Sequence, residues 1–291
     1  MSKPETMGMP TTRHGVVPAN RANLYYELRG AGPALLLIPG ASGDAGMYAM
    51  AAEHLSRDFT VLTYDRRGNS RSLPPAGWEA TTVDEQADDA AALITALDLA
   101  PAHVFGNSSG ATIAINLALR HPGVLRTVVA HEPPKIGTLP NRDEFLAQLR
   151  DRMDAAVKAG GYGHAMDDFH GWLTGPDDAD IDAADLRQRV QANGENWIRR
   201  ELGVVDRYDP PAELVARRTT PLVIGIGTTG GTELHTALLA TYTEALRQLA
   251  EHLGARFLSF TGAHVPYQTV PDTFAAELGG VLLAAGEDGG R

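Results

Sequence analysis

The feature that most constrains the fold of this 291-residue chain is the run VFGNSSGA at positions 104–111. An apolar, strand-like stretch ends there in a G-x-S-x-G pattern and passes directly into a helix-like stretch at 112–119. A nucleophile elbow has this pattern, because its sharp strand-to-helix turn exposes the serine side chain, here Ser108. Glycines beside the serine leave room for the neighbouring chain. An ordinary Gly/Ser loop is the competing interpretation, but the flanking strand and helix favour the elbow.

Strand and helix signals alternate on both sides of this run, which is typical of an α/β sheet flanked by helices. Besides the strand that leads to Ser108, strands are expected at 22–29, 34–38, 59–64, 125–131, 222–226 and 256–260. Helices are expected at 47–55, 83–97, 109–120, 234–253 and 271–283. Between them, charged helical segments separated by Gly and Pro pairs indicate a helical insertion. We therefore expect core residues 1–134, a helical cap at 135–219 and core residues 220–291, with loose tails at 1–13 and 286–291.

Composition excludes several classes of function. A formal net charge of −11 and the absence of a Lys/Arg cluster argue against nucleic-acid binding. The chain has no cysteine, which excludes disulfides, thiolate metal sites and a cysteine nucleophile. The first residues lack the apolar segment of a signal peptide, and no apolar run is long enough to cross a bilayer. We expect a cytoplasmic protein that binds no membrane and needs no cofactor or metal; whether it forms a homodimer stays open.

Parallel sheets bind ligands outside the carboxyl ends of their strands, so the loops there are candidate site loops. The loop PGASG at 39–43 follows an apolar strand and could present the Ala41 N–H to a developing oxyanion, beside the N–H of Ser109. An ordinary glycine-rich turn is the alternative interpretation. The loop TGAHVP at 261–266 follows the last expected strand and carries His264, in the position of a general base.

The acid that orients this histidine is less clear from the sequence. An aspartate normally follows the next-to-last strand, but GTTGGTE at 227–233 has neutral residues where it is expected. Glu132 follows the preceding strand and is stiffened by two prolines, so it could accept the N–H of His264. The order Ser108, Glu132, His264 keeps nucleophile, acid and base in sequence. Glu233 is the reserve candidate, and a surface turn is the alternative role for Glu132.

These residues together resemble the α/β-hydrolase superfamily over nearly the whole chain. The segment DRRGNSRS at 65–72 is similar to the strand-four loop of that family. Within it, lactone hydrolases that open zearalenone-type macrolides resemble this chain in SSGA at the elbow, in HEPP at 131–134 and in HVPY at 264–267. The resemblance implies that Glu132 is the acid and that Trp197 stacks on substrate. Pro39-Gly40 replaces the usual His-Gly, which leaves the second oxyanion donor open between Ala41 and Gly40, with Gly40 also a candidate substrate contact.

The expected reaction is hydrolysis of a small hydrophobic ester or lactone through an acyl-enzyme on Ser108. A cofactor-free perhydrolase, a carbon–carbon bond hydrolase and a slow-turnover small-molecule receptor would share the same motifs. Pocket-lining candidates in the cap are aromatic: Tyr162, Phe169, Trp172 and Trp197. Packing between cap helices would explain all of them except Trp197 at least as well. The densest group of potential metal ligands is more simply a solvated helix face: His164, Asp167, Asp168 and His170.

Overall fold

The computed structural model describes most of the chain, in segments 12–134, 142–174, 183–205, 207–230 and 232–288. An eight-stranded sheet of order β1-β2-β4-β3-β5-β6-β7-β8 runs through it. β1 and β2 are antiparallel to their neighbours, and the strands from β4 to β8 run parallel. The strands are β1 (Arg13–Ala19), β2 (Ala22–Arg29), β3 (Ala34–Ile38), β4 (Thr60–Tyr64), β5 (Ala102–Asn107), β6 (Leu125–His131), β7 (Leu222–Gly227) and β8 (Arg256–Phe260).

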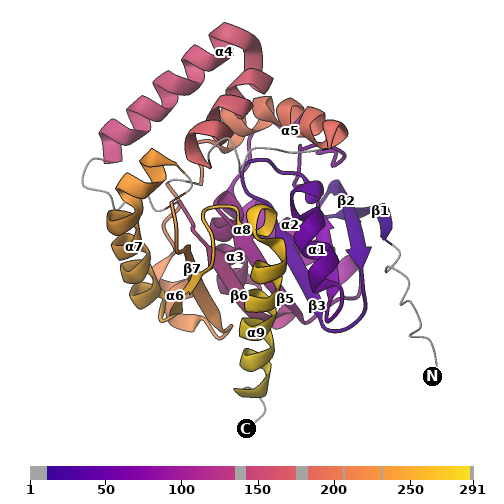
Figure 1. Ribbon diagram of the computed structural model, residues 1–291. Helices are drawn as coiled ribbons and strands as arrows, with labels where there is room; N and C mark the ends of the chain where they lie inside the picture. Colours follow the sequence, from indigo (N-terminus) through magenta and orange to yellow (C-terminus); the bar gives the residue numbers. More distant parts are fainter. Residues whose placement is uncertain (1–11, 135–141, 175–182, 206, 231, 289–291) are drawn as a thin grey trace, which may run out of the picture.

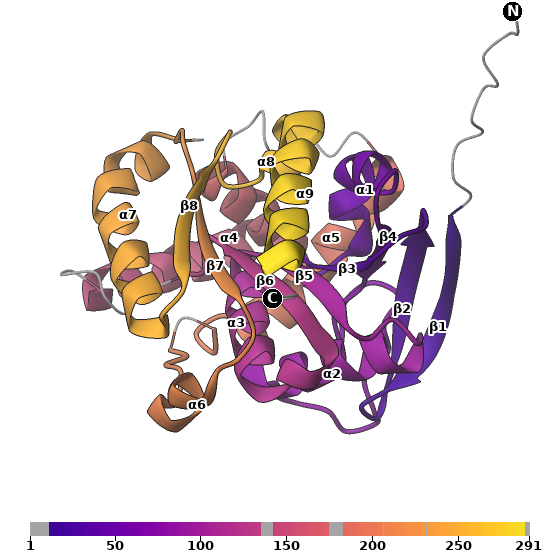
Figure 2. The same cartoon turned by 90° about the horizontal axis from the view of Figure 1, so that it is seen from below.

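Helices cover both faces of the sheet. α1 and α9 lie on one face, and α2 and α3 lie on the other (Figure 2). The α-helices are α1 (Ala49–Leu55), α2 (Val83–Ala96), α3 (Ser109–Arg120), α4 (Arg142–Leu173), α5 (Ala184–Asn196), α6 (Ala212–Arg217), α7 (Glu233–Leu253), α8 (Pro266–Thr269) and α9 (Pro271–Asp288). Short helical turns are η1 (Ala45–Tyr48), η2 (Pro122–Val124) and the π-helical η4 (Trp197–Glu201). The predicted α/β class, with a mostly parallel sheet, is confirmed.

The central strands are buried on both faces, which is why they are continuous apolar runs in the sequence. Every residue of β5 and of β7 is buried, and so are the last four residues of β3. β1 differs because it is an edge strand with an alternating, mostly exposed pattern and an internal Pro18. Its weak apolar signal explains why the sequence did not predict this strand. Of the expected loose tail 1–13, residues 1–11 lie outside the described residues, and Arg13 begins β1.

The predicted helical insertion is present between β6 and β7. Its helices α4 and α5 lie above the edge of the sheet where the parallel strands end (Figure 1). α4 is interrupted at Gly161, whose φ of 82° breaks the helix at the Gly-Gly pair seen in the sequence. The short α6 returns to the core, where Leu214 and Val215 pack against the cluster that includes α3. No strand occurs in the described parts of this insertion.

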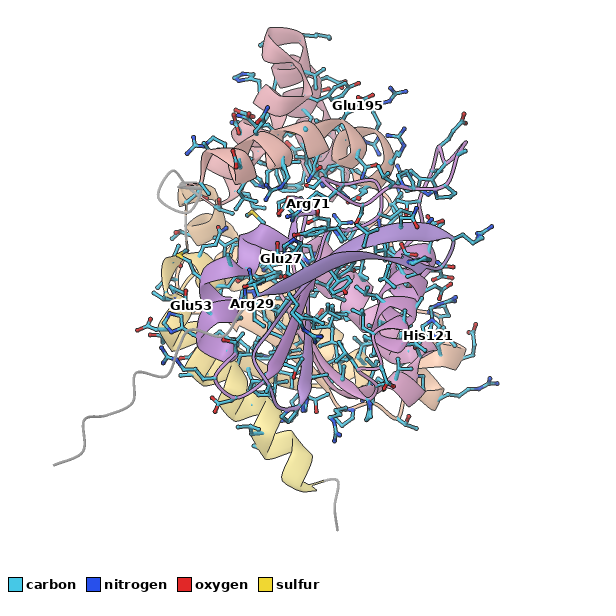
Figure 3. All side chains as sticks on the ribbon, turned by 90° about the vertical axis from the view of Figure 1, so that its right-hand side faces the viewer. Glu27, Arg29, Glu53, Arg71, His121 and Glu195 are labelled. Carbon is cyan, nitrogen blue, oxygen red and sulfur yellow. The ribbon has the colours of Figure 1, made fainter. Side chains whose placement is uncertain are left out.

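Ion pairs join the sheet to the loops beneath the insertion. Arg71 lies beside Glu27 of β2 at this junction, and Arg29 lies further down the same strand (Figure 3). Arg71 Nη1 is 3.3 Å from Glu27 Oε1, and its Nε donates to Asp65 Oδ2 at 2.7 Å. The Asp65 carboxylate also accepts the amide N–H of Ala45 at 2.8 Å. The segment 65–72 after β4 thus connects the loop after β3 to the sheet.

Among the described residues, no helix is both long enough and apolar enough to cross a membrane.

Candidate active site

Ser108 occupies the turn between strand β5 and helix α3. Its backbone has φ 54° and ψ −126°, a conformation with positive φ that non-glycine residues seldom adopt. The turn is tight, because a Cβ atom on Gly106 would lie 2.2 Å from the Gly110 carbonyl oxygen. A Cβ atom on Gly110 would lie 2.3 Å from the Ile38 carbonyl oxygen. The geometry is therefore that of a nucleophile elbow, and neither glycine can gain a side chain without backbone movement.

Backbone amides surround this turn. The Ser108 amide donates to the His131 carbonyl at 2.9 Å, which ties the elbow to the end of β6. Ser109 begins α3, so its N–H lies in the first helical turn, whose amides have no acceptor within the helix. Within the described segments, neither the Ser109 N–H nor the Ala41 N–H meets a hydrogen-bond acceptor. Both are therefore available to bind a negatively charged oxygen.

His264 and Glu132 come from different loops and contact each other. His264 Nδ1 lies 2.6 Å from Glu132 Oε2, and both residues are buried. His264 lines the same pocket as Ser108. A carboxylate at Nδ1 fixes the imidazole tautomer with Nε2 unprotonated, which is the form that can accept a proton. The structure thus brings the predicted residues His264 and Glu132 into contact beside the pocket that Ser108 lines.

The backbone around Glu132 places its carboxylate beside His264, although the sequence pattern led us to expect a carboxylate after β7. Glu132 has a φ of 49°, an unfavourable conformation for a non-glycine residue that brings its side chain to the sheet edge. Its amide donates to the Gly225 carbonyl at 2.9 Å, and its Oε1 accepts the Gly227 N–H at 2.8 Å. The end of β7 thus supplies an amide donor where a carboxylate was expected. The reserve candidate Glu233 lies in α7, with its side chain outside the described residues.

Asn107, directly before Ser108, connects three parts of the site and was not identified from the sequence. Its Nδ2 donates to the His264 carbonyl at 2.8 Å and lies 3.1 Å from His131 Nδ1. Its Oδ1 accepts the Tyr267 hydroxyl at 3.0 Å. Asn107 is fully enclosed, so these bonds hold the His264 loop against the elbow. A lone Asn inside G-x-S-x-G carries no sequence signal for such a role.

A pocket opens onto Ser108. Its floor is formed by the loops after β3, β5 and β8, and its roof by the C-terminal part of α4. The wall is mostly apolar, which is typical of sites for small molecules. The lining residues are Gly40, Ala41, Ser42, Met47, Asn107, Ser108, Phe169, His170, Leu173, Thr174, His264, Val265, Tyr267 and Gln268.

His170 places a second imidazole in this pocket, roofing it from α4. Burial lowers the pKa of His170 to about 4; nearby Asp167 opposes this change, and His264 adds to it. The ring is therefore uncharged at neutral pH and can both donate and accept a hydrogen bond. The sequence pattern groups His170 only with possible metal ligands and gives no sign of its place in the pocket.

The predicted aromatic lining of the insertion is present only in part. Phe169 lines the pocket. Trp197 is buried behind it, with ring centroids 4.1 Å apart, and is not among the lining residues. Trp172 stacks on Phe145 at 5.9 Å, and neither Trp172 nor Tyr162 lines the pocket at Ser108. The expected contact of Trp197 with substrate therefore stays a prediction that would require movement of Phe169.

Potential metal ligands do not gather in the described part of the chain into any group of three that could hold an ion. The acidic residues near His170 have other partners. Asp167 accepts from Gln191 at 2.7 Å, and Asp168 forms an ion pair with Arg152 at 2.6 Å.

Comparison with known proteins decides the family. The sequence profile described as alpha/beta hydrolase fold matches residues 33–254. The chain belongs to the α/β-hydrolase family. This α/β hydrolase is 29% identical over 272 residues to the uncharacterized hydrolase YraK of Bacillus subtilis (strain 168), a match that covers 94% of this chain and 97% of YraK.

Two further matches extend over nearly the whole chain. Zearalenone hydrolase of Bionectria ochroleuca is 28% identical over 273 residues, which cover 91% of this chain and 95% of that protein. The crystal structure of a thermophilic esterase from Thermogutta terrifontis matches with a TM-score of 0.71 at 18% identity, covering 94% of this chain and 99% of that one. The structural match concerns the fold alone, whereas the sequence relatives include hydrolases.

Proposed function

We propose that this α/β hydrolase cleaves carboxylic esters or lactones through an acyl-enzyme intermediate, with Ser108, His264 and Glu132 as its catalytic triad. The observation that carries the proposal is the 2.6 Å contact of Glu132 Oε2 with His264 Nδ1, behind a pocket that Ser108 and His264 both line. Relatives named as hydrolases, one of them a zearalenone hydrolase, support a small hydrophobic substrate.

In the proposed reaction, Ser108 Oγ attacks the carbonyl carbon while His264 Nε2 takes the hydroxyl proton. The carbonyl oxygen becomes an oxyanion that the Ala41 and Ser109 N–H groups bind. His264 then gives the proton to the departing alcohol oxygen, and the C–O bond breaks to leave an acyl-Ser108. Water repeats the sequence and releases the acid. Glu132 keeps the imidazole in one orientation and stabilises its charged form.

Gly40 belongs to this site through its backbone. A Cβ atom on Gly40 would lie 3.2 Å from Ser108 Cβ and 3.1 Å from the Asn107 carbonyl oxygen. The loop therefore approaches the nucleophile closely, which is what an oxyanion donor requires. Gly40 and Ala41 both line the pocket, and neither amide meets an acceptor in the described segments; we propose Ala41 as the donor of the two, because Arg66 holds the Gly40 carbonyl, which fixes the direction of the Ala41 N–H.

We also infer that residues 135–219 form a cap on a core of residues 1–134 and 220–291. Support comes from α4, whose residues roof the pocket, and from α5 and η4, which pack beside it. Cap residues would therefore select the substrate, while the core supplies the chemistry.

The proposal is tested with a panel of p-nitrophenyl esters and the macrolactone zearalenone, comparing wild type with Ser108→Ala. Ser108-dependent opening of zearalenone would support lactone hydrolysis, and turnover of simple esters alone would restrict the activity to esters. Absence of any Ser108-dependent hydrolysis would contradict the proposal. Tight binding of the macrolactone without turnover would then favour a receptor. Ser108-dependent formation of a peroxyacid would favour a perhydrolase, and Ser108-dependent cleavage of a carbon–carbon bond would favour a hydrolase of that type.

A further inference from the structure

The carbonyl of Gly40 is held from outside the pocket. It accepts a hydrogen bond from Arg66 Nη2 at 2.8 Å and one from the Gly43 N–H at 3.1 Å. Gly40 C=O and Ala41 N–H belong to the same planar trans peptide unit, so they point in opposite directions. A donor that fixes the Gly40 carbonyl therefore also fixes the direction of the Ala41 N–H, the proposed oxyanion donor.

Arg66 is in turn held by the helical insertion. Its Nη2 also donates to Glu201 Oε2 at 2.5 Å, and both side chains are 1% exposed. Glu201 is the last residue of η4, far from Arg66 in the sequence. Its other oxygen, Oε1, accepts from Asn69 Nδ2 at 3.2 Å and from Asn196 Nδ2 at 3.0 Å. Both carboxylate oxygens are thus occupied, which fixes the guanidinium in one position.

Helix α5 holds the same loop at further points. Asn193 Nδ2 donates to the Ser42 carbonyl at 2.7 Å. Arg189 Nε forms an ion pair with Asp44 at 2.7 Å. Contacts from α5 therefore reach the loop at positions 42 and 44, and η4 reaches position 40 through Arg66. The insertion roofs the pocket with a different helix, α4. Helix α5 and η4 therefore support the loop after β3.

We propose that Glu201 is a positioning residue for catalysis, which acts through Arg66 to hold the Gly40–Ala41 peptide with its N–H toward the reacting oxygen. The inference rests on the proposed function, because it assigns the support of the oxyanion site in that same reaction. A buried ion pair that only docked the insertion would also stabilise the fold. If Glu201 only docks the insertion, its loss lowers stability but leaves kcat of the folded enzyme unchanged. If Glu201 positions the Gly40–Ala41 peptide, its loss also lowers kcat of the folded enzyme.

The test compares Glu201→Gln with Asp89→Asn. Asp89 forms an equally buried pair with Arg67, Nε to Oδ2 at 2.8 Å, but contacts no part of the loop after β3 in the described segments. Both changes are expected to lower Tm. Only Glu201→Gln is expected to lower kcat on a p-nitrophenyl ester, by about 10- to 100-fold with a smaller change in KM, since loss of one oxyanion donor costs roughly 10²–10³. Equal kcat in the two folded variants would overturn the proposal.

A second variant covers the case in which Glu201→Gln does not fold. Arg66→Met combined with Glu201→Leu removes both charges, and such neutral replacements of buried pairs are often tolerated. This double variant is expected to fold yet to show the same loss of kcat, because, among the described residues, only the Gly43 N–H then holds the Gly40 carbonyl. Wild-type kcat in the folded double variant would contradict the assignment of Glu201 and Arg66.

A measurement that needs no substrate separates this inference from the proposed function. The Gly43 N–H donates to the Gly40 carbonyl at 3.1 Å, so its exchange reports how firmly that carbonyl is held. Amide hydrogen exchange of Gly43, followed by NMR, is expected to accelerate in Glu201→Gln and to stay unchanged in Asp89→Asn. This result would hold even if wild type hydrolysed no ester, in which case only the proposed function would fail. Unchanged exchange at Gly43 in both variants would show that Glu201 does not hold the peptide.

Discussion

Glu132 shows how a single side chain depends on contacts distant in the sequence. Its oxygens have separate partners, with Oε1 on the Gly227 N–H and Oε2 on His264 Nδ1. The sequence could indicate Glu132 because the residue follows a buried strand and because the resemblance supports it. It could not indicate the positive φ or the Gly227 donor, since both arise from the way β6 and β7 end side by side.

Glu132→Gln tests whether the two oxygens of Glu132 have these separate partners. The amide oxygen of Gln is expected to keep the Gly227 N–H, which turns the NH₂ group toward His264 Nδ1. The imidazole would then carry its proton on Nε2 and could not accept the proton of Ser108. We expect kcat to fall by about 10²–10⁴ with little change in Tm. Kinetics on a p-nitrophenyl ester measure the effect, and nearly full activity would exclude Glu132 as the acid.

His170 gives a prediction about pH dependence. Because burial lowers the pKa of His170 to about 4, the ring is uncharged above about pH 5. His170→Gln therefore replaces one neutral group by another, and the acid limb of the kcat/KM profile between pH 5 and 8 should keep its midpoint. His170→Lys, which adds a cation near His264, should move that midpoint to lower pH. A displaced midpoint in His170→Gln would mean that His170 is charged in this range.

The helices of the insertion have different tasks. α4 carries the pocket roof, with Phe169 and His170, whereas α5 and η4 carry the residues that hold the loop after β3. The sequence predicted that this region is helical because of its charged segments and Gly/Pro breaks. It did not predict which helix faces the pocket, since pairs such as Arg66 and Glu201 meet only through packing of distant segments. The edge strand β1 was missed because most of its residues are exposed, so it has no apolar run in the sequence.

Phe169 lines the pocket, whereas Trp197 does not. Its ring lies against buried Trp197, with centroids 4.1 Å apart, so Phe169→Ala should extend the pocket to the indole. We expect kcat/KM for p-nitrophenyl octanoate to rise relative to the acetate by about 10-fold or more, since each added methylene in a pocket contributes roughly 1–3 kcal/mol. Phe145→Ala is the control, because Phe145 packs on Trp172 away from the described pocket. An unchanged ratio in Phe169→Ala would show that long acyl chains bind elsewhere.

A buried histidine in the central sheet, His103, makes the stability of the whole molecule depend on pH. His103 of β5 is 4% exposed, and its ring meets Phe59 edge-on at 6.1 Å. Its Nδ1 has no hydrogen-bond partner among the described residues. Burial lowers the pKa of His103 to about 4, and the positive charge of Arg126 contributes to the decrease. Such a histidine packs as an aromatic ring and resists protonation while the protein is folded.

The unfolded chain binds a proton at His103 near pH 6.5, whereas the folded protein binds it only near pH 4. The unfolded state therefore holds more protons between these values, so His103 makes the free energy of unfolding fall as pH falls from about 6.5 toward 4. His103→Leu removes this dependence. We expect Tm near wild type at pH 7.5 and a Tm advantage for the variant that grows by on the order of a few degrees at pH 4.5. Thermal unfolding across this range measures it, with His252→Leu on the exposed face of α7 as the control. A constant Tm difference between His103→Leu and wild type at every pH would mean that His103 titrates alike in both states.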